Sequence, residues 1–244
     1  MWSPELISDR LRLAGGLSVS HESIFRFIYT EAWESIPFLA RSHKRRWSRV
    51  PGGRPRKSRI ANRVGIEDHP GEVDNREQFG HWESDSVVSR ASKVSLNVLV
   101  ERKSRYLNLS KLPGQTSIHT RRAIVGRLSE YSESARRSIT YDNGSENVDH
   151  GLVNTELRTR SYFCNSYRSR EKGTVENTAG LMRRYIPKGT DIGKYTHSEI
   201  EEIEWRLNNR SRKCLGFQTP TEVFQQLISY FHLLLIYKKF SISY

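Results

Sequence analysis

Cysteine is scarce in this chain. Only Cys164 and Cys214 occur, far apart and without a CxxC pair. This pattern excludes a disulfide framework and a zinc ribbon. The eight histidines show no HxxxH spacing, so a zinc site of that kind is not expected either. A protein with these features is suited to a reducing compartment, and we expect it in the cytosol of its cell.

Long hydrophobic runs are also missing. The longest, from Leu227 to Tyr237, contains Ser229 and His232 and is too short to cross a bilayer as a helix. Met1-Trp2-Ser3-Pro4 opens the chain with neither a basic nor an apolar targeting segment. We therefore expect no signal peptide and no membrane partner, and we interpret the run as a packed or partly exposed C-terminal helix.

Negative charge is in short supply relative to positive charge. The 244 residues contain 40 Lys and Arg against 27 Asp and Glu, which gives a formal charge of +13. The usual partner of such an imbalance is a polyanion, with nucleic acid first and an anionic membrane second. The length allows one large domain, or a catalytic domain with a small companion.

The first forty residues have the outline of a helix-turn-helix. Ser3-Pro4-Glu5 is a helix start, and the helix should run to about Leu13 before Gly15-Gly16 break it. Residues 19–29 then show the spacing of a second, amphipathic helix. An ordinary helical hairpin fits this outline equally well. If the unit binds DNA, the outer face of its second helix presents Ser20, His21, Ser23 and Arg26 to base edges.

Residues 41–75 are predicted to be a basic linker. Between residues 41 and 59 there are nine Lys or Arg and no acidic residue, and Pro51-Gly52-Gly53 breaks regular structure. A run of one charge is often only solvated, but beside a possible DNA-binding unit this density favours phosphate contact. The candidate contacts are Arg45, Arg46, Arg54, Arg56 and Lys57.

Residues 76–225 carry the pattern of an α/β domain with a mixed sheet. Three closely connected strands indicate an antiparallel meander. A helix and two short strands follow, so the sheet should be flanked by helices. The predicted strands are Gly80–Val88, Val94–Glu101, Tyr106–Leu112, Ser138–Tyr141 and Arg160–Phe163, and the predicted helix is Ser117–Tyr131.

Two aspartates stand out in this domain. Asp85 lies mid-strand on the same face as His81 and Glu83, where a charge is costly unless something pairs with it. Asp142 opens the turn Asp-Asn-Gly at the end of a strand, and ligands bind at strand ends of open sheets. Taken alone, Asp142 is better explained as a turn residue that caps its own loop.

Glu176 lies near the start of a predicted helix whose apolar stripe is Val175, Ala179, Met182 and Ile186. Taken alone it is a first-turn glutamate favoured by the helix dipole. Three acids together suit a pair of Mg²⁺ ions, with Mn²⁺ as a substitute, because hard divalent cations prefer carboxylate oxygens. Phosphoryl transfer needs mainly positioning and charge neutralisation. The neighbouring residues expected to contact phosphate are Lys172, Arg183 and Arg184.

Several ordered strings resemble the insertion-sequence-30 transposase family. They are Phe79–Asp85, Leu99–Tyr106, Thr140–Glu146, Lys172–Asn177, Tyr185–Asp191, Leu207–Arg210, Leu215–Gly216 and Thr219–Phe224. Glu176 follows Asp142 by 34 positions, which agrees with the acidic-triad spacing of that family and of related integrases. The resemblance runs from Trp2 to about Phe224.

The resemblance implies a ribonuclease H-like fold with Asp85 on the first strand, Asp142 after the fourth and Glu176 on a later helix. The first and fourth strands are neighbours in that fold, which would bring the two aspartates together. It also implies cleavage at inverted terminal repeats and strand transfer into target DNA with Mg²⁺ or Mn²⁺. A homo-oligomer on DNA and no small-molecule substrate are expected.

Two alternatives to an active transposase stay open. Members of the family usually carry a further N-terminal DNA-binding unit, so we expect a truncated copy with residues 226–244 as a tail outside the resemblance. The first alternative is that such a copy is catalytically inactive and acts as a DNA-binding protein or repressor. A generic ribonuclease H-type nuclease is the second alternative, and the helix-turn-helix outline argues against it.

Overall fold

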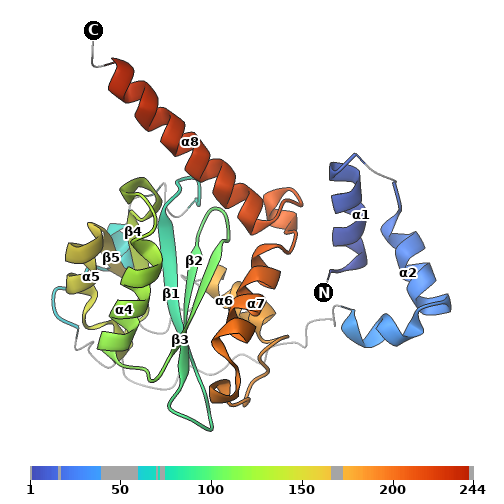
Figure 1. The fold of residues 1–244 in the computed structure, drawn as a ribbon, viewed down its shortest axis with the longest axis horizontal. Helices are drawn as coiled ribbons and strands as arrows, with labels where there is room; N and C mark the ends of the chain where they lie inside the picture. The colour runs from blue at the N-terminus through green and yellow to red at the C-terminus, as the bar shows by residue number, and fades with distance from the viewer. Residues whose placement is uncertain are drawn as a thin grey trace.

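The computed structural model describes residues 2–15, 18–39, 60–69, 71, 75–165 and 173–241. A five-stranded mixed sheet is its centre (Figure 1). The strands are β1 (His81–Val88), β2 (Ser95–Glu101), β3 (Leu107–Leu112), β4 (Ser138–Tyr141) and β5 (Arg160–Phe163). Their order is β3-β2-β1-β4-β5, with the first three antiparallel and β1, β4 and β5 parallel. The first and fourth strands are neighbours, which is the arrangement expected of a ribonuclease H-like fold.

Helices cover both faces of this sheet (Figure 1). The helices are α1 (Pro4–Leu13), α2 (His21–Thr30), α4 (Ser117–Leu128), α5 (His150–Leu157), α6 (Gly173–Met182), α7 (His197–Asn208) and α8 (Pro220–Ser241). Short 3-10 segments are η1 (Trp33–Phe38), η2 (Ile66–Asp68), η3 (Glu133–Ala135), η4 (Ser145–Asn147), η6 (Ile192–Lys194) and η7 (Lys213–Leu215). Within the described residues, no helix is both long and apolar enough to pass through a bilayer.

The alternation of side chains along β1 divides the interior into two cores. Trp82 points into a cluster that includes Phe79, Ile124 of α4 and Phe224 of α8. Val87 points into a second cluster, which includes Val175 of α6 and residues of α7. Trp82 and Val87 therefore lie on opposite faces of β1.

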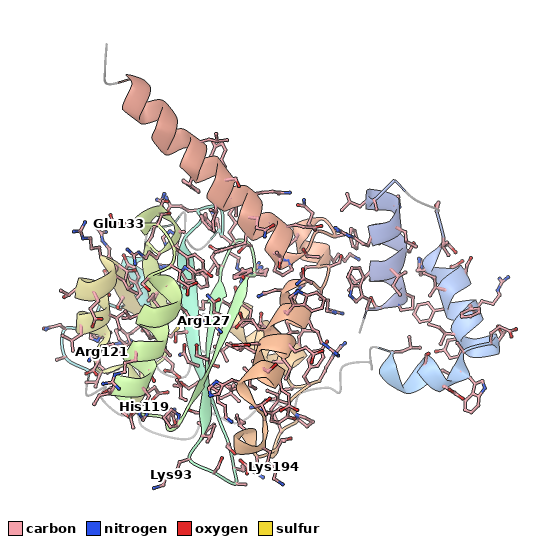
Figure 2. All side chains as sticks on the ribbon, in the orientation of Figure 1. Lys93, His119, Arg121, Arg127, Glu133 and Lys194 are labelled. Carbon is pink, nitrogen blue, oxygen red and sulfur yellow. The ribbon has the colours of Figure 1, made fainter. Side chains whose placement is uncertain are left out.

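Helix α7 protects the outer edge of the sheet at β3. The side-chain amide of Asn208 both accepts a hydrogen bond from the Leu107 amide and donates one to the Leu107 carbonyl, at 2.9 and 2.8 Å. Glu204 accepts from the Leu109 amide, and Arg127 of α4 donates to the Leu109 carbonyl and to Glu204 (Figure 2). An edge strand covered in this way no longer offers free backbone groups to another chain.

Of the two helices at the N terminus, α1 begins where the sequence predicts, and α2 begins at His21, two residues later than predicted. The Ser3 side chain accepts from the Leu6 amide at the start of α1, and the Ser20 side chain accepts from the Ser23 amide at the start of α2. Gly15 follows α1 with a φ of +69°, a conformation that glycine adopts without strain. Helix α1 contacts the opposite end of the chain, because Arg10 pairs with Glu222 of α8.

Two helices, α6 and α4, end earlier than the sequence predicts. Helix α6 ends at Met182 instead of continuing to Ile186, whose amide bonds back to the Met182 carbonyl just before Pro187. Helix α4 ends at Leu128 rather than Tyr131. The C-terminal run is part of a single helix, α8, whose start has the predicted capping box between Thr219 and Glu222.

Candidate active site

The register between β1 and β4 places the two aspartates side by side. The last paired residues are Glu83 and Thr140, and each strand reaches its aspartate two residues later, at Asp85 and Asp142. Asp85 lies in β1 and Asp142 directly follows β4, so the register brings the two aspartates to the same level of neighbouring strands. Both are half-buried, so solvent and ions still reach them.

The loop after β4 orients one oxygen of Asp142. Its Oδ1 accepts from the Gly144 amide at 3.1 Å and from the Asn147 side-chain amide at 2.8 Å. Asn147 ends the short segment η4 and is buried. Donors of this kind fix the direction in which a carboxylate presents its remaining lone pairs. The sequence analysis gave Asn147 no role, and its only signal was its position five residues after Asp142.

Strand β1 also holds the first turn of α6. Glu83 is fully buried, and its Oε2 accepts from the Val175 amide at 2.8 Å. Its other oxygen lies 3.3 Å from Nε of Arg102, which is also buried. A helix N-terminus leaves amides without partners, and a carboxylate is a favourable acceptor for them. The sequence analysis placed Glu83 beside Asp85 but did not identify this contact.

Glu176 follows Val175 in that first turn, so α6 brings its backbone to the face of the sheet that carries Glu83 and Asp85. The side chain of Glu176 lies outside the described part of the structure. Among the side chains that are described, no group of three His, Cys, Asp or Glu is placed to hold a metal ion. The convergence of all three acids therefore stays a prediction.

The residues predicted to contact DNA fall into three groups. His21, Ser23 and Arg26 are exposed on α2, and Ser20 is exposed at its cap, where its hydroxyl also bonds to that of Ser23. Arg183 and Arg184 follow the end of α6, half-buried and exposed respectively. The remainder lie outside the described residues: Arg45, Arg46, Arg54, Arg56, Lys57 and Lys172.

His81 has a structural environment, as the sequence analysis expected. Its ring nitrogens lie 2.7 Å from the Ser138 hydroxyl and 2.7 Å from the Gln78 side-chain oxygen. Burial lowers the pKa of His81 to about 3, with smaller contributions from His69, Arg137 and Arg102. The ring is therefore neutral at physiological pH, and both of its nitrogens are used in packing β1 against its neighbours.

Comparison with known proteins gives a consistent result. The chain is 35% identical over 236 residues to the transposase of insertion sequence element IS1086 from Cupriavidus metallidurans, covering 93% of this chain and 70% of that protein. It is 36% identical over 234 residues to the transposase of IS4351 from Bacteroides fragilis, with the same coverages. It is 35% identical over 236 residues to the transposase InsI of IS30A from Escherichia coli, covering 92% of this chain and 61% of that protein.

No family model matches the chain. Among solved structures, the catalytic core domain of BIV integrase is similar, with a TM-score of 0.49 and 18% identity over 63% of this chain and 98% of that one. Transposases from three bacteria are therefore 35% or 36% identical to this chain over more than nine tenths of its length. We conclude that this chain belongs to the insertion-sequence-30 family of transposases.

Proposed function

We propose that this chain cleaves DNA at the ends of its own mobile element and joins the freed 3′ ends to target DNA. Asp85, Asp142 and Glu176 are its catalytic residues in this proposal. The observation that supports it is the register of β1 and β4, in which Asp85 and Asp142 each follow the last paired residue by two positions, and both are half-buried. Phosphoryl transfer with two divalent ions requires adjacent acids of this kind.

The donor set fits a pair of divalent ions, Mg²⁺ or Mn²⁺. Carboxylate oxygens are the ligands such ions prefer, and Oδ1 of Asp142 is held by two donors. When bound, these ions neutralise the charge that develops on the attacked phosphodiester. The protein residues have the task of positioning: Asn147 and Gly144 orient Asp142, and Glu83 holds the helix that carries Glu176.

The proposal extends to partners. Joining element ends to a target involves the terminal inverted repeats, the target duplex and at least two copies of the chain on the DNA. The excess of positive charge, +13, favours binding to all of these DNA segments. We place this activity in the bacterial cytosol, at the nucleoid.

The test uses oligonucleotide duplexes that carry the element's own ends. Asp142→Asn and Glu176→Gln should each abolish nicking in Mg²⁺ and in Mn²⁺, because each removes a charged ligand while keeping the shape of the side chain. Non-specific DNA binding should stay within about twofold of the wild type, since no phosphate contact is lost. Glu133→Gln is the matched control, because Glu133 is an exposed acid that precedes β4, at the end of the strand opposite to Asp142 (Figure 2).

Undiminished nicking by either triad variant would refute the assignment. A wild-type protein that retards DNA in gels yet never nicks it would favour the alternative, a DNA-binding remnant of a transposase. Strand transfer by the wild type, lost in both variants and kept in Glu133→Gln, is the expected result.

A further inference from the structure

Segment η4 carries a second polar side chain besides Asn147. Glu146 is buried, with 6% of its surface exposed, although glutamate in a short surface segment is usually solvated. Its Oε1 accepts a hydrogen bond from the side-chain amide of Gln115 at 2.6 Å. Gln115 directly precedes the N-cap residue of α4, so this bond joins η4 to the start of α4. The loop after β4 is therefore held by a residue 31 positions away in the chain.

Gly144 leaves the space that this carboxylate occupies. A Cβ at position 144 would overlap both carboxylate oxygens of Glu146. The φ of Gly144 is −68°, which any residue can adopt, so the backbone conformation does not require glycine here. The Gly144 amide also donates to Asp142. The Glu146 carboxylate thus packs closely against the residue whose amide orients Asp142.

A small cavity borders η4. Its volume is about 10 Å³, which is room for one water molecule, and its lining includes Thr120 of α4, Glu146 of η4 and His150 of α5. Within the described residues, Oγ1 of Thr120 and Nδ1 of His150 are buried without a hydrogen-bond partner. The interior beside η4 is therefore polar and not closely packed. Apolar packing contributes little to holding η4 there, and the hydrogen bond of Glu146 matters correspondingly more.

We propose that Glu146 is a positioning residue for the carboxylate of Asp142. Its bond to Gln115 fixes η4 on α4, and η4 ends in Asn147, whose side-chain amide donates to Asp142 Oδ1 at 2.8 Å. Without the bond to Gln115, η4 can shift, and the donor to Oδ1 moves with it. A carboxylate held by fixed donors binds a divalent ion more tightly than one that is free to turn. The inference rests on the proposed function, because it takes Asp142 as a ligand of Mg²⁺ or Mn²⁺.

The experiment measures Mn²⁺ binding to the full chain without DNA, from the electron paramagnetic resonance signal of free Mn²⁺. Glu146→Ala should weaken binding by about tenfold, because it removes the acceptor for Gln115. Glu146→Gln keeps an oxygen that accepts from Gln115 and should stay within about threefold of the wild type. The control is Glu156→Ala, which removes an exposed acid of α5 that pairs with Arg121 of α4, and it should bind Mn²⁺ as the wild type does.

A second variant tests the same contact without removing the acid. Gly144→Ala places a methyl group where the Glu146 carboxylate lies, so it should displace the carboxylate from Gln115 and weaken Mn²⁺ binding by about tenfold as well. In the Glu146→Ala background there is no carboxylate to displace, so adding Gly144→Ala should change the Mn²⁺ affinity by less than about twofold. Circular dichroism and melting temperature without metal show whether each variant is folded.

The expected result is a loss of Mn²⁺ affinity in Glu146→Ala and in Gly144→Ala, with Glu146→Gln and Glu156→Ala near the wild type. Equal losses in the Ala and Gln variants of Glu146 would overturn the proposal, because its charge would then matter and its hydrogen bond would not. Unchanged Mn²⁺ affinity in Glu146→Ala, with or without a lower melting temperature, would also overturn it, and so would additive losses in the double variant. Equal Mn²⁺ affinity in the wild type and Asp142→Asn would contradict the proposed function itself.

Discussion

Along β1, side chains one residue apart enter two unlike environments. On one face, Trp82 stacks with Tyr131 at 5.8 Å between ring centroids, and its ring nitrogen donates to the Ala135 carbonyl at 2.8 Å. On the other face, His81, Glu83 and Asp85 follow each other, and two of them are buried polar groups with specific partners. The first face gains stability from apolar area. On the second face, buried polar groups lower the stability of the fold unless they are paired, and their hydrogen bonds position the residues of the candidate site.

This difference implies that substitutions on the two faces have different consequences. On the aromatic face a truncation should lower stability and leave the chemistry of the folded molecules intact. On the polar face a truncation should lower both the stability and the cleavage rate of the folded molecules, because the same groups hold α6 and surround the candidate site.

The largest effect is expected for Glu83→Ala. It removes the acceptor for the Val175 amide and the ion-pair partner of Arg102, both buried, and should cost about 3–5 kcal/mol of unfolding free energy. Cleavage by the molecules that remain folded should fall by about 10–100-fold, since α6 loses its anchor. Urea denaturation and nicking rates normalised to folded protein measure the two effects.

Glu83→Gln is the conservative counterpart and guards against a variant that does not fold. Its amide oxygen still accepts from Val175, so cleavage should recover to near the wild type although stability stays about 1–3 kcal/mol lower. Equal cleavage by the Ala and Gln variants would mean that Glu83 does not position α6. Glu156→Gln, in a surface pair with Arg121, should change stability by less than about 1 kcal/mol.

Phe224→Ala tests the aromatic face. Phe224 is buried and stacks on Tyr106 with ring centroids 4.2 Å apart, so its removal leaves a cavity and should cost about 3–5 kcal/mol. Nicking per folded molecule should stay within about twofold. Tyr230→Ala, at an exposed position of the same helix, should be nearly neutral in urea denaturation. A specific loss of nicking in Phe224→Ala would break the distinction between the faces.

The last effect depends on pH and concerns His81. Because the pKa of its buried ring is about 3 in the folded protein and near 6.5 when unfolded, the unfolded chain takes up the proton first as pH falls. The stability due to neutral His81 is thus complete above pH 6.5 and is lost progressively towards pH 3, by up to about 1.4 kcal/mol per pH unit.

His81→Gln should remove that part of the acid sensitivity, measured as unfolding free energy at a series of pH values. His197→Gln is the control, because His197 is exposed. The unfolding free energy of this variant should depend on pH as that of the wild type does. If His81→Gln and the wild type lose stability in parallel below pH 6.5, the ring is not held neutral by burial.

Much of the fold was predictable because strands and helix starts depend on the pattern of neighbouring residues. The strands Ser138–Tyr141 and Arg160–Phe163 have the predicted bounds, and the starts of α1 and α8 have the predicted caps. Helix α5 and helix α7 were not predicted. Helix α7 had a usable signal in its Thr196 to Glu199 capping box, followed by apolar residues at helical spacing. Helix α5 has only eight residues and a weak pattern.

The candidate site was predictable to a lesser degree. Asp85 and Asp142 were chosen from strand position and from family strings, and the strand order that makes them neighbours came from the resemblance. Glu83 and Asn147 were missed as positioning residues because each acts on a group that is distant in sequence or hidden in a turn. The division into units at residues 1–40, 41–75, 76–225 and 226–244 stays a prediction.

The amino-acid sequence by itself determined the alternation of β1, the capped helix starts, the excess of positive charge and the family of the chain. These are properties of neighbouring residues or of composition, so no folding is needed to see them. Only the tertiary structure decided that Glu83 holds α6 and that Asn147 orients Asp142. Such contacts join residues far apart in the chain, and their distances depend on strand register and helix packing, which no local pattern encodes.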